Sequence, residues 1–361
     1  MIKYLGSKRL LAPVIGDVAE AIGARTAVDL FTGTTRVAQE LKRRGLFVTA
    51  VDIATYSEVL AACYIAADAR SVDEARLRDE IGRLNAIEGR RGYVTETFCE
   101  KARYFQSHNG ARIDAIRDEL EGRRDDPLFP MLLTSLLLAA DRVDSTTGVQ
   151  MAYLKQWAPR AHQELQLRCP DLLSGPGRAV RGDARASVEE LDHVDLVYLD
   201  PPYNQHRYFT NYHVWETLVR WDAPAHYGVA CKRVDARDEA TKSVFNVKRR
   251  MPDAFVDLLG RVRADVVVVS YNDESWLSPD AIVTGLLEAG HDAVELVAFD
   301  SRRYIGAQIG IFNPAGEKVG AVSRLRNVEY LFLAGPADHV ATATAAALAG
   351  GGRPGRAATP V

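Results

Sequence analysis

Short apolar runs alternate with helical segments along this 361-residue chain, and that alternation limits the possible folds more than any other feature. Seven runs are predicted to be strands, at residues 26–31, 47–52, 179–182, 195–200, 265–271, 293–299 and 328–333. Residues 35–44, between the first two, carry apolar side chains at helical spacing. A strand, helix, strand order predicts parallel strands covered by helices on both faces. We therefore expect an α/β protein with a Rossmann-like, doubly wound sheet of seven strands.

The spacing of these strands divides the chain into parts. The second and third strands lie much further apart than the roughly dozen residues that a helical crossover needs. We therefore expect residues 67–177 to be a mainly helical insertion, with helices at 112–120 and 130–140, in a domain formed by residues 1–66 and 178–335. A solvated helical cap is the alternative interpretation of the insertion. Residues 304–320 are predicted to form a hairpin or long loop, and residues 336–361, rich in Ala, Thr, Gly and Pro, a disordered tail.

Composition excludes several classes of protein. The net charge of −3 gives no overall basic character, so nucleic-acid binding would need a local basic groove. The four cysteines are far apart and form no C-x-x-C pair, which argues against a disulfide framework or a zinc site. No run approaches the roughly 18 apolar residues of a membrane span, and Pro13, Gly16 and Asp17 interrupt the N-terminal apolar stretch. We expect a cytoplasmic protein with no membrane partner and no metal.

The strongest chemical signal is Asp200-Pro201-Pro202-Tyr203, directly after an apolar strand. The carboxyl end of a strand is where α/β sheets place their ligands. An exocyclic base amine is a poor nucleophile, and a carboxylate and a backbone carbonyl that each accept one amine hydrogen would localise its lone pair. Proline fixes φ and presents its carbonyl rigidly, while Tyr203 offers a face on which an extruded base can stack. We predict these four residues to be catalytic in methylation of a base amine; a rigid Pro-Pro turn is the alternative.

A ligand-binding loop is predicted at the end of the first strand, where the sequence is Asp29-Leu30-Phe31-Thr32-Gly33-Thr34-Thr35. Gly33 allows a tight turn, and the amides that open the next helix can bind polar groups. Asp52 ends the second strand, where dinucleotide-binding folds place a carboxylate on ribose hydroxyls. Asp183 ends the third strand and is placed to accept from an adenine amine, although a solvated turn aspartate is equally compatible.

Together with Lys3-Tyr4-x-Gly6-Ser7-Lys8, these motifs resemble the Dam-like DNA adenine methyltransferases of the alpha group, over roughly residues 1–335. The resemblance implies S-adenosylmethionine as cofactor, double-stranded DNA as partner, and the insertion as the target-recognition region. It implies cofactor contacts from Tyr4, Lys8, Asp52 and Asp200, with Lys3 facing DNA. The chain departs from the family where Thr35 replaces the usual second glycine of the cofactor loop.

The segments 104–120, 132–157 and 211–219 resemble methylases that partner restriction endonucleases cutting outside their sites. This implies a restriction-modification system, with a cognate endonuclease as a further partner. Of Tyr208, Tyr212 and Trp215, we expect two to pack in the core and the third to be available to flanking bases.

Candidate DNA contacts are Arg112, Arg142 and Arg160 in the insertion, and Lys248 and Arg249 after the catalytic tetrapeptide. Arginines can read guanine edges and basic runs can contact phosphates, although a solvated charge run is equally compatible with the latter. Alternative functions are amino methylation of RNA adenine, DNA cytosine or protein glutamine, and a DNA-binding relative that has lost catalysis. Asp200 favours adenine, since the cytosine amine enzymes usually carry serine at this position and the glutamine enzymes asparagine.

Overall fold

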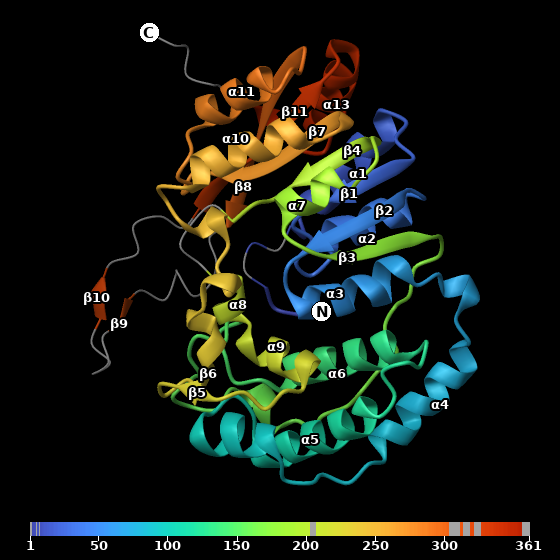
Figure 1. Ribbon diagram of the computed structural model, residues 1–361, viewed down its shortest axis with the longest axis vertical. Coiled ribbons are helices and arrows are strands. Elements are labelled where there is room, and N and C mark those ends of the chain that lie inside the picture. Colours follow the sequence, from blue (N-terminus) through green and yellow to red (C-terminus); the bar gives the residue numbers. More distant parts are fainter. Residues whose placement is uncertain are drawn as a thin grey trace.

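A computed structural model describes residues 2–4, 6, 8–202, 207–302, 311–312, 318–320 and 326–355 of the chain. Tyr203 therefore lies outside the described residues. The chain forms an eight-stranded sheet flanked by helices, with a mainly helical body beside it (Figure 1). The strands of the sheet are β1 (Thr26–Asp29), β2 (Phe47–Asp52), β3 (Gly177–Arg181), β4 (Val194–Leu199), β7 (Ala264–Asn272), β8 (Ala293–Arg302), β11 (Arg326–Gly335) and β12 (Arg353–Pro354).

The sheet has the strand order β12-β8-β11-β7-β4-β1-β2-β3. Strands β3, β2, β1, β4 and β7 are parallel, whereas β11 runs antiparallel to both β7 and β8. All seven predicted strands form, and the predicted doubly wound α/β fold is confirmed; the eighth strand, β12, pairs with the edge of β8. In the central strand β7, Val266 and Val268 face one core while Val267 and Val269 face the other. This explains the uniformly apolar run, because a central parallel strand is buried on both faces.

Helices cover both faces of the sheet (Figure 1). The helices on one face are α1 (Leu11–Ala21), α2 (Arg36–Arg43) and α13 (Ala337–Ala349), and those on the other are α7 (Ala184–Glu189), α10 (Met251–Arg261) and α11 (Pro279–Glu288).

Helix α13 overturns the prediction that residues 336–361 are disordered, as far as Gly355, the last described residue. Val340, Ala343 and Ala347 are buried on one side of α13, and the last two pack in the same core as α1. An alanine-rich composition suggested low complexity, but alanine has the highest helix propensity and allows close packing on a sheet.

The helical body lies beyond the β3 end of the sheet, next to α3 (Thr55–Ala61) (Figure 1). It contains α4 (Glu74–Asn85), α5 (Ser107–Glu121) and α6 (Phe129–Val143), and the helices predicted at 112–120 and 130–140 lie within the last two. Its core, however, also contains Trp215 and Leu218 of α9 (His213–Arg220). The short helix α8 (Tyr208–Asn211) and the hairpin of β5 (His226–Tyr227) and β6 (Lys232–Arg233) complete this part of the chain.

The helical body is therefore assembled from segments on both sides of Asp200. The boundaries 67–177 remain a prediction for the insertion itself. Between β8 and β11, the pair β9 (Ile311–Phe312) and β10 (Lys318–Gly320) is antiparallel, in agreement with the hairpin expected in residues 304–320.

Candidate active site

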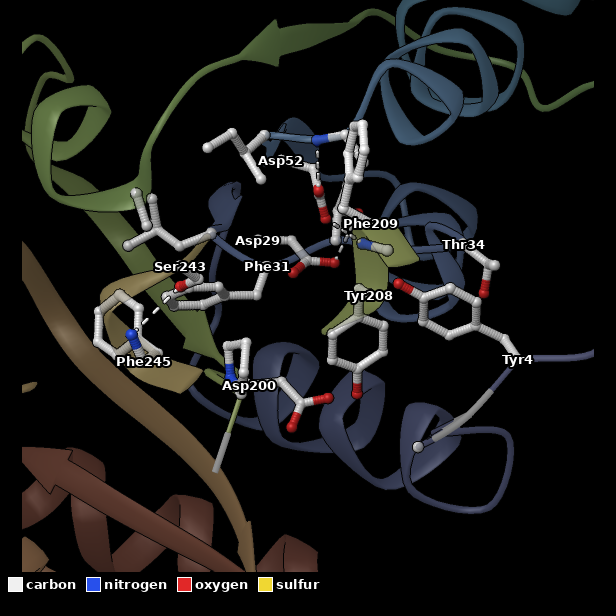
Figure 2. A pocket seen from close by; sticks show the side chains of 18 of the residues that line it. Tyr4, Asp29, Phe31, Thr34, Asp52, Asp200, Tyr208, Phe209, Ser243 and Phe245 are labelled. Carbon is white, nitrogen blue, oxygen red and sulfur yellow. Dashed lines mark hydrogen bonds between the residues drawn. The ribbon is translucent and has the colours of Figure 1, made fainter. Parts of the chain in front are cut away.

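A deep pocket lies at the carboxyl edge of the parallel strands, the edge at which open α/β sheets bind ligands (Figure 2). Every predicted cofactor residue lines it: Tyr4, Lys8, Asp29, Phe31, Gly33, Thr34, Asp52, Asp183 and Asp200. Of the predicted catalytic residues, Asp200 and Pro202 line the same pocket and Pro201 is buried between them. The structure thus brings together residues from four separate strand ends, while the roles assigned to them remain predictions.

The loop after β1 keeps a tight turn without a second glycine. Gly33 has a φ of +50°, and a Cβ at this position would lie 3.0 Å from the ring of Tyr4. Thr35 adopts the left-handed conformation with a φ of 62° and is completely buried. Its hydroxyl donates to the Thr34 carbonyl at 2.7 Å and accepts from the Gln39 side-chain amide at 2.7 Å. These two bonds hold threonine in a conformation that costs about 1–2 kcal/mol for a residue with a side chain.

Two carboxylates, the buried Asp29 and the half-buried Asp52, organise this loop. The Asp52 oxygens accept from the Gly33 amide at 2.8 Å and from the Ala54 amide at 2.9 Å, which ties the loop to the end of β2. One Asp29 oxygen accepts from the Thr32 hydroxyl at 2.9 Å and the Ala38 amide at 3.2 Å. The other oxygen of Asp29 is buried without a hydrogen-bond partner among the described residues. Burial raises the pKa of Asp29 to about 7 and also raises that of Asp52.

Asp200 lies in the same pocket, with the Lys8 ammonium 3.2 Å from one of its oxygens. Burial raises the pKa of Asp200 to about 6, and the Lys8 charge opposes that rise. Lys8 also lies 3.1 Å from a carboxylate oxygen of Glu329 on β11. Glu329 was not predicted from the sequence, because a glutamate at the start of a predicted strand carries no signal of its own.

Aromatic rings form two walls of the pocket, as Figure 2 shows for Tyr4 and Tyr208 on one side and Phe31 and Phe245 on the other. Tyr4 stacks on Tyr208 with ring centroids 5.3 Å apart, and Phe31 meets Phe245 edge to face at 5.2 Å. Flat rings of this kind suit planar heterocyclic ligands.

Two of the three aromatic residues after the tetrapeptide pack in the core, as expected: Tyr212 and Trp215 are buried. Tyr208 lines the pocket, and a contact with a flanking base stays a prediction. Phe245 was not predicted, because nothing in the sequence of its short helical turn, Val244–Asn246, indicates that this segment lies beside the pocket.

Glu216 of α9 is a further pocket residue that was not predicted from the sequence. Its side chain is buried, lines the pocket, and accepts from the Thr55 amide at 3.2 Å and from the Thr55 hydroxyl. Burial raises the pKa of Glu216 to about 7. This contact joins α9 to the N-terminus of α3, and so connects the helical body with the pocket.

The predicted DNA-binding residues fall into two groups. Lys3 and Arg160 share the buried carboxylate of Asp144, at 2.9 and 2.8 Å. Arg112 and Arg142 each donate to a backbone carbonyl, of Asn85 at 2.8 Å and of Gln166 at 2.6 Å. The guanidinium and ammonium groups of this first group are therefore at least partly engaged within the protein. Lys248 and Arg249, by contrast, are exposed in the turn before α10.

The sheet topology and the pocket at its carboxyl edge define a Rossmann-like methyltransferase fold. A sequence model of the D12 class N6 adenine-specific DNA methyltransferase family matches residues 4–284, and the chain belongs to that family. The family predicted from the motifs is thereby confirmed.

Curated relatives agree with this assignment. Modification methylase StsI of Streptococcus sanguinis is 28% identical over 325 residues, covering 84% of this chain and 49% of the relative. Type II methyltransferase M.FokI of Planomicrobium okeanokoites is 29% identical over 313 residues, covering 80% and 47%. Type II methyltransferase M.NlaIII of Neisseria lactamica is 30% identical over 294 residues, covering 77% and 85%. The chain thus spans about half the length of the first two relatives. Within the described residues, no helix has both the length and the apolar character of a membrane span.

Proposed function

We propose that this protein transfers a methyl group from S-adenosylmethionine to the exocyclic N6 amine of adenine in double-stranded DNA, at a specific sequence. The observation that carries the proposal is the position of Asp200 and Pro202 in one pocket with Asp52 and the loop around Gly33. If these residues have the predicted roles, the base-amine site and the nucleoside site would be adjacent, as methyl transfer between two bound partners requires. The family to which the chain belongs supports adenine as the target.

The pocket has groups suited to S-adenosylmethionine, a cation that supplies an electrophilic methyl group. The buried, unpartnered oxygen of Asp29 can accept from an ammonium group. Asp52 would hold ribose hydroxyls and Asp183 the adenine amine of the cofactor. Ile53 follows Asp52, lines the pocket and is 50% exposed as a residue, which offers an apolar surface to a base. Tyr4, Lys8, Phe31 and Thr34 would complete the walls of this cofactor site.

Asp200 and the Pro201 carbonyl would each accept one hydrogen of the target amine. An acceptor carboxylate must be ionised, and with a pKa of about 6 Asp200 is mainly ionised at neutral pH. The two hydrogen bonds would draw the amine nitrogen toward tetrahedral geometry, so that its lone pair could attack the methyl carbon. The N–C bond would form as the S–C bond of the sulfonium breaks, and S-adenosylhomocysteine would leave with that electron pair on sulfur. No covalent nucleophile of the enzyme takes part, and the displaced amine proton leaves to solvent. Tyr203 would stack on the extruded base.

Methyl transfer from labelled S-adenosylmethionine to unmethylated duplex DNA tests the proposal directly. We expect N6-methyladenine after nuclease digestion and mass spectrometry. Asp200→Ala should abolish it while DNA retention on a filter persists, because phosphate contacts supply most of the affinity. The matched control Asp192→Ala alters an exposed carboxylate outside the pocket and should remain active. Methylated cytosine, preference for RNA, or wild-type turnover of Asp200→Ala would refute the assignment.

For DNA binding, we propose phosphate contacts from Lys248 and Arg249, and target reading by the helical body with Arg112, Arg142, Arg160 and Lys3. The exposed position of Lys248 and Arg249 supports contact with DNA phosphates. Exchange of residues 67–177, together with residues 208–233 that complete the helical body, for a relative's segments should change the methylated sequence, which sequencing of modified bases would show.

We further propose a cognate restriction endonuclease as partner, supported by the relatives that are named modification methylases. DNA methylated by this protein should then resist that endonuclease. The free thiols of Cys63, Cys99 and Cys231, buried without disulfides, support action in the reducing cytoplasm.

A further inference from the structure

We propose that Glu329 is a positioning residue for methyl transfer, which holds the Lys8 ammonium at the place where it contacts the Asp200 carboxylate. The proposal rests on the proposed function of Asp200 as acceptor for the target amine. Glu329 lies far from the catalytic tetrapeptide in sequence and acts through Lys8, so it is not itself expected to touch the substrate.

The sheet topology explains how Glu329 reaches the site. Strand β4 ends at Leu199, which is paired with Val269 of the neighbouring strand β7. Strand β11 runs antiparallel to β7, so its first residues lie at the edge where β4 and β7 end. Glu329 is paired with Asn272, near the end of β7. Because β11 is antiparallel to β7, Glu329 at its start lies next to Asp200 at the end of β4.

Alternation along the strands puts both acids on one face of the sheet. Asp200 is two residues after Tyr198, and Glu329 is two residues before Leu331; both neighbours belong to the core that α1 covers. Since side chains two residues apart share a face, Asp200 and Glu329 point to the α1 side. Lys8 precedes α1, and its carbonyl accepts from the Ala12 amide at 2.7 Å in the first turn of that helix. The helix therefore places Lys8 above both acids.

The three charges form a compact and largely buried group. The side chains of Lys8, Glu329 and Asp200 are 6%, 15% and 19% exposed. The ammonium is 3.2 Å from Asp200 and 3.1 Å from Glu329, so it bridges the two carboxylates. Burial of a charge is costly unless the charge is paired, and Glu329 fixes the ammonium by a second charge-assisted bond. With one cation shared between two acids, Asp200 keeps negative charge that it can offer to an amine.

Glu329 also affects the protonation of Asp200. Its negative charge raises the pKa of Asp200, in opposition to Lys8. The other groups that act electrostatically with Asp200 are Asp29 on β1, Tyr198 on β4 and Tyr271 on β7. Replacing Glu329 with glutamine should therefore lower the pKa of Asp200, whereas replacing Lys8 with methionine should raise it. These opposite shifts test the arrangement of the three charges, and the kcat of Glu329→Ala tests the positioning role.

The test uses the full chain with Glu329→Gln, Glu329→Ala, Glu329→Asp and Lys8→Met. The matched control is Glu295→Gln, which changes an exposed glutamate on β8, near the far end of the sheet. In Glu329→Gln, the acid limb of kcat/KM for DNA should move to lower pH, on the order of one unit for two charges this close. In Lys8→Met the limb should move the other way. Glu329→Ala should lower kcat roughly tenfold to a hundredfold with little change in KM, because the ammonium loses its anchor. Glu329→Asp should recover part of that loss.

The Asp200 titration measured by carbon NMR of labelled protein, assigned with Asp200→Asn, provides a readout that does not depend on turnover. A lower Asp200 pKa in Glu329→Gln supports the charge contacts on which the proposal rests, whereas absence of N6-methyladenine from the wild-type reaction would refute the proposed function separately. The proposal is overturned if the titration and the acid limb stay unchanged in Glu329→Gln. It is also overturned if Glu329→Ala retains wild-type kcat, or loses activity only in proportion to lost thermal stability.

Discussion

Replacement of Gly33 by alanine should destabilise the protein through the ring of Tyr4. The left-handed conformation at Gly33 costs a residue with a Cβ about 1–2 kcal/mol. The added Cβ would lie 3.0 and 3.2 Å from two ring carbons of Tyr4 and 3.2 Å from its hydroxyl oxygen, and overpacking of this kind costs about 1–3 kcal/mol. Tyr4 cannot easily retreat, because it stacks on Tyr212 at 4.5 Å and its hydroxyl is bonded to that of Tyr56.

Loss of chain entropy in the unfolded state offsets this by about 0.4–1 kcal/mol. The net change in the free energy of unfolding should therefore be a loss of about 1–5 kcal/mol, measured by urea unfolding followed by circular dichroism.

Two glycines provide controls that separate these contributions. Gly45 has a φ of +88°, but no atom lies within 4 Å of the place that an alanine Cβ would take, so Gly45→Ala carries only the conformational cost. Gly82, inside α4, has neither a positive φ nor a close neighbour, so Gly82→Ala should stabilise the protein by about 0.5–1 kcal/mol. In a Tyr4→Ala background, Gly33→Ala should cost no more than Gly45→Ala. If Gly33→Ala and Gly45→Ala are equal in the wild-type background as well, the expected contribution of the Tyr4 contact is refuted.

Other perturbations test further parts of the site. Asp52→Asn should weaken S-adenosylmethionine binding about tenfold to a hundredfold in calorimetry with little effect on DNA affinity, since bonds to a charged acceptor contribute about 1.5–3 kcal/mol. The kcat/KM for DNA should fall as pH drops below about 6, because burial raises the pKa of Asp200 to that value and a protonated carboxyl is a poorer acceptor; a flat profile from pH 5 to pH 8 would contradict this. Arg249→Ala should weaken binding to all duplexes alike and reduce the salt slope by about 1, without changing the methylated sequence. Truncation after Gly335 should lower the melting temperature, because it removes α13 from the core shared with α1, and an unchanged melting temperature would show that α13 contributes little.

The strands and the residues at their carboxyl ends could be predicted from the sequence. Asp52 and Asp200 could be placed because each directly follows an apolar run, and parallel strands end at one edge of a sheet. Glu329 and Phe245 could not, because each reaches the pocket through tertiary structure: an antiparallel strand in one case and a returning turn in the other.

Two local features also escaped prediction for physical reasons. Thr35 takes a glycine-like conformation because its hydroxyl bonds to Thr34 and Gln39 hold it there, and a side chain held by such contacts leaves no pattern in the sequence. Helix α13 escapes prediction because its Ala- and Thr-rich composition is also typical of disordered tails, although burial of Val340, Ala343 and Ala347 holds it on the protein.

The two-part origin of the helical body has a consequence for how such a protein can acquire a new specificity by recombination. The Arg117 guanidinium of α5 is buried and donates to the carbonyls of Leu218 and Val219 at the end of α9, at 2.6 and 3.1 Å. These contacts join a segment that precedes Asp200 to one that follows it. A crossover that exchanges only residues 67–177 would pair α5 of one lineage with α9 of another. Inheritance of a working recognition body therefore favours exchange of both segments together, with the catalytic tetrapeptide left between two crossover regions.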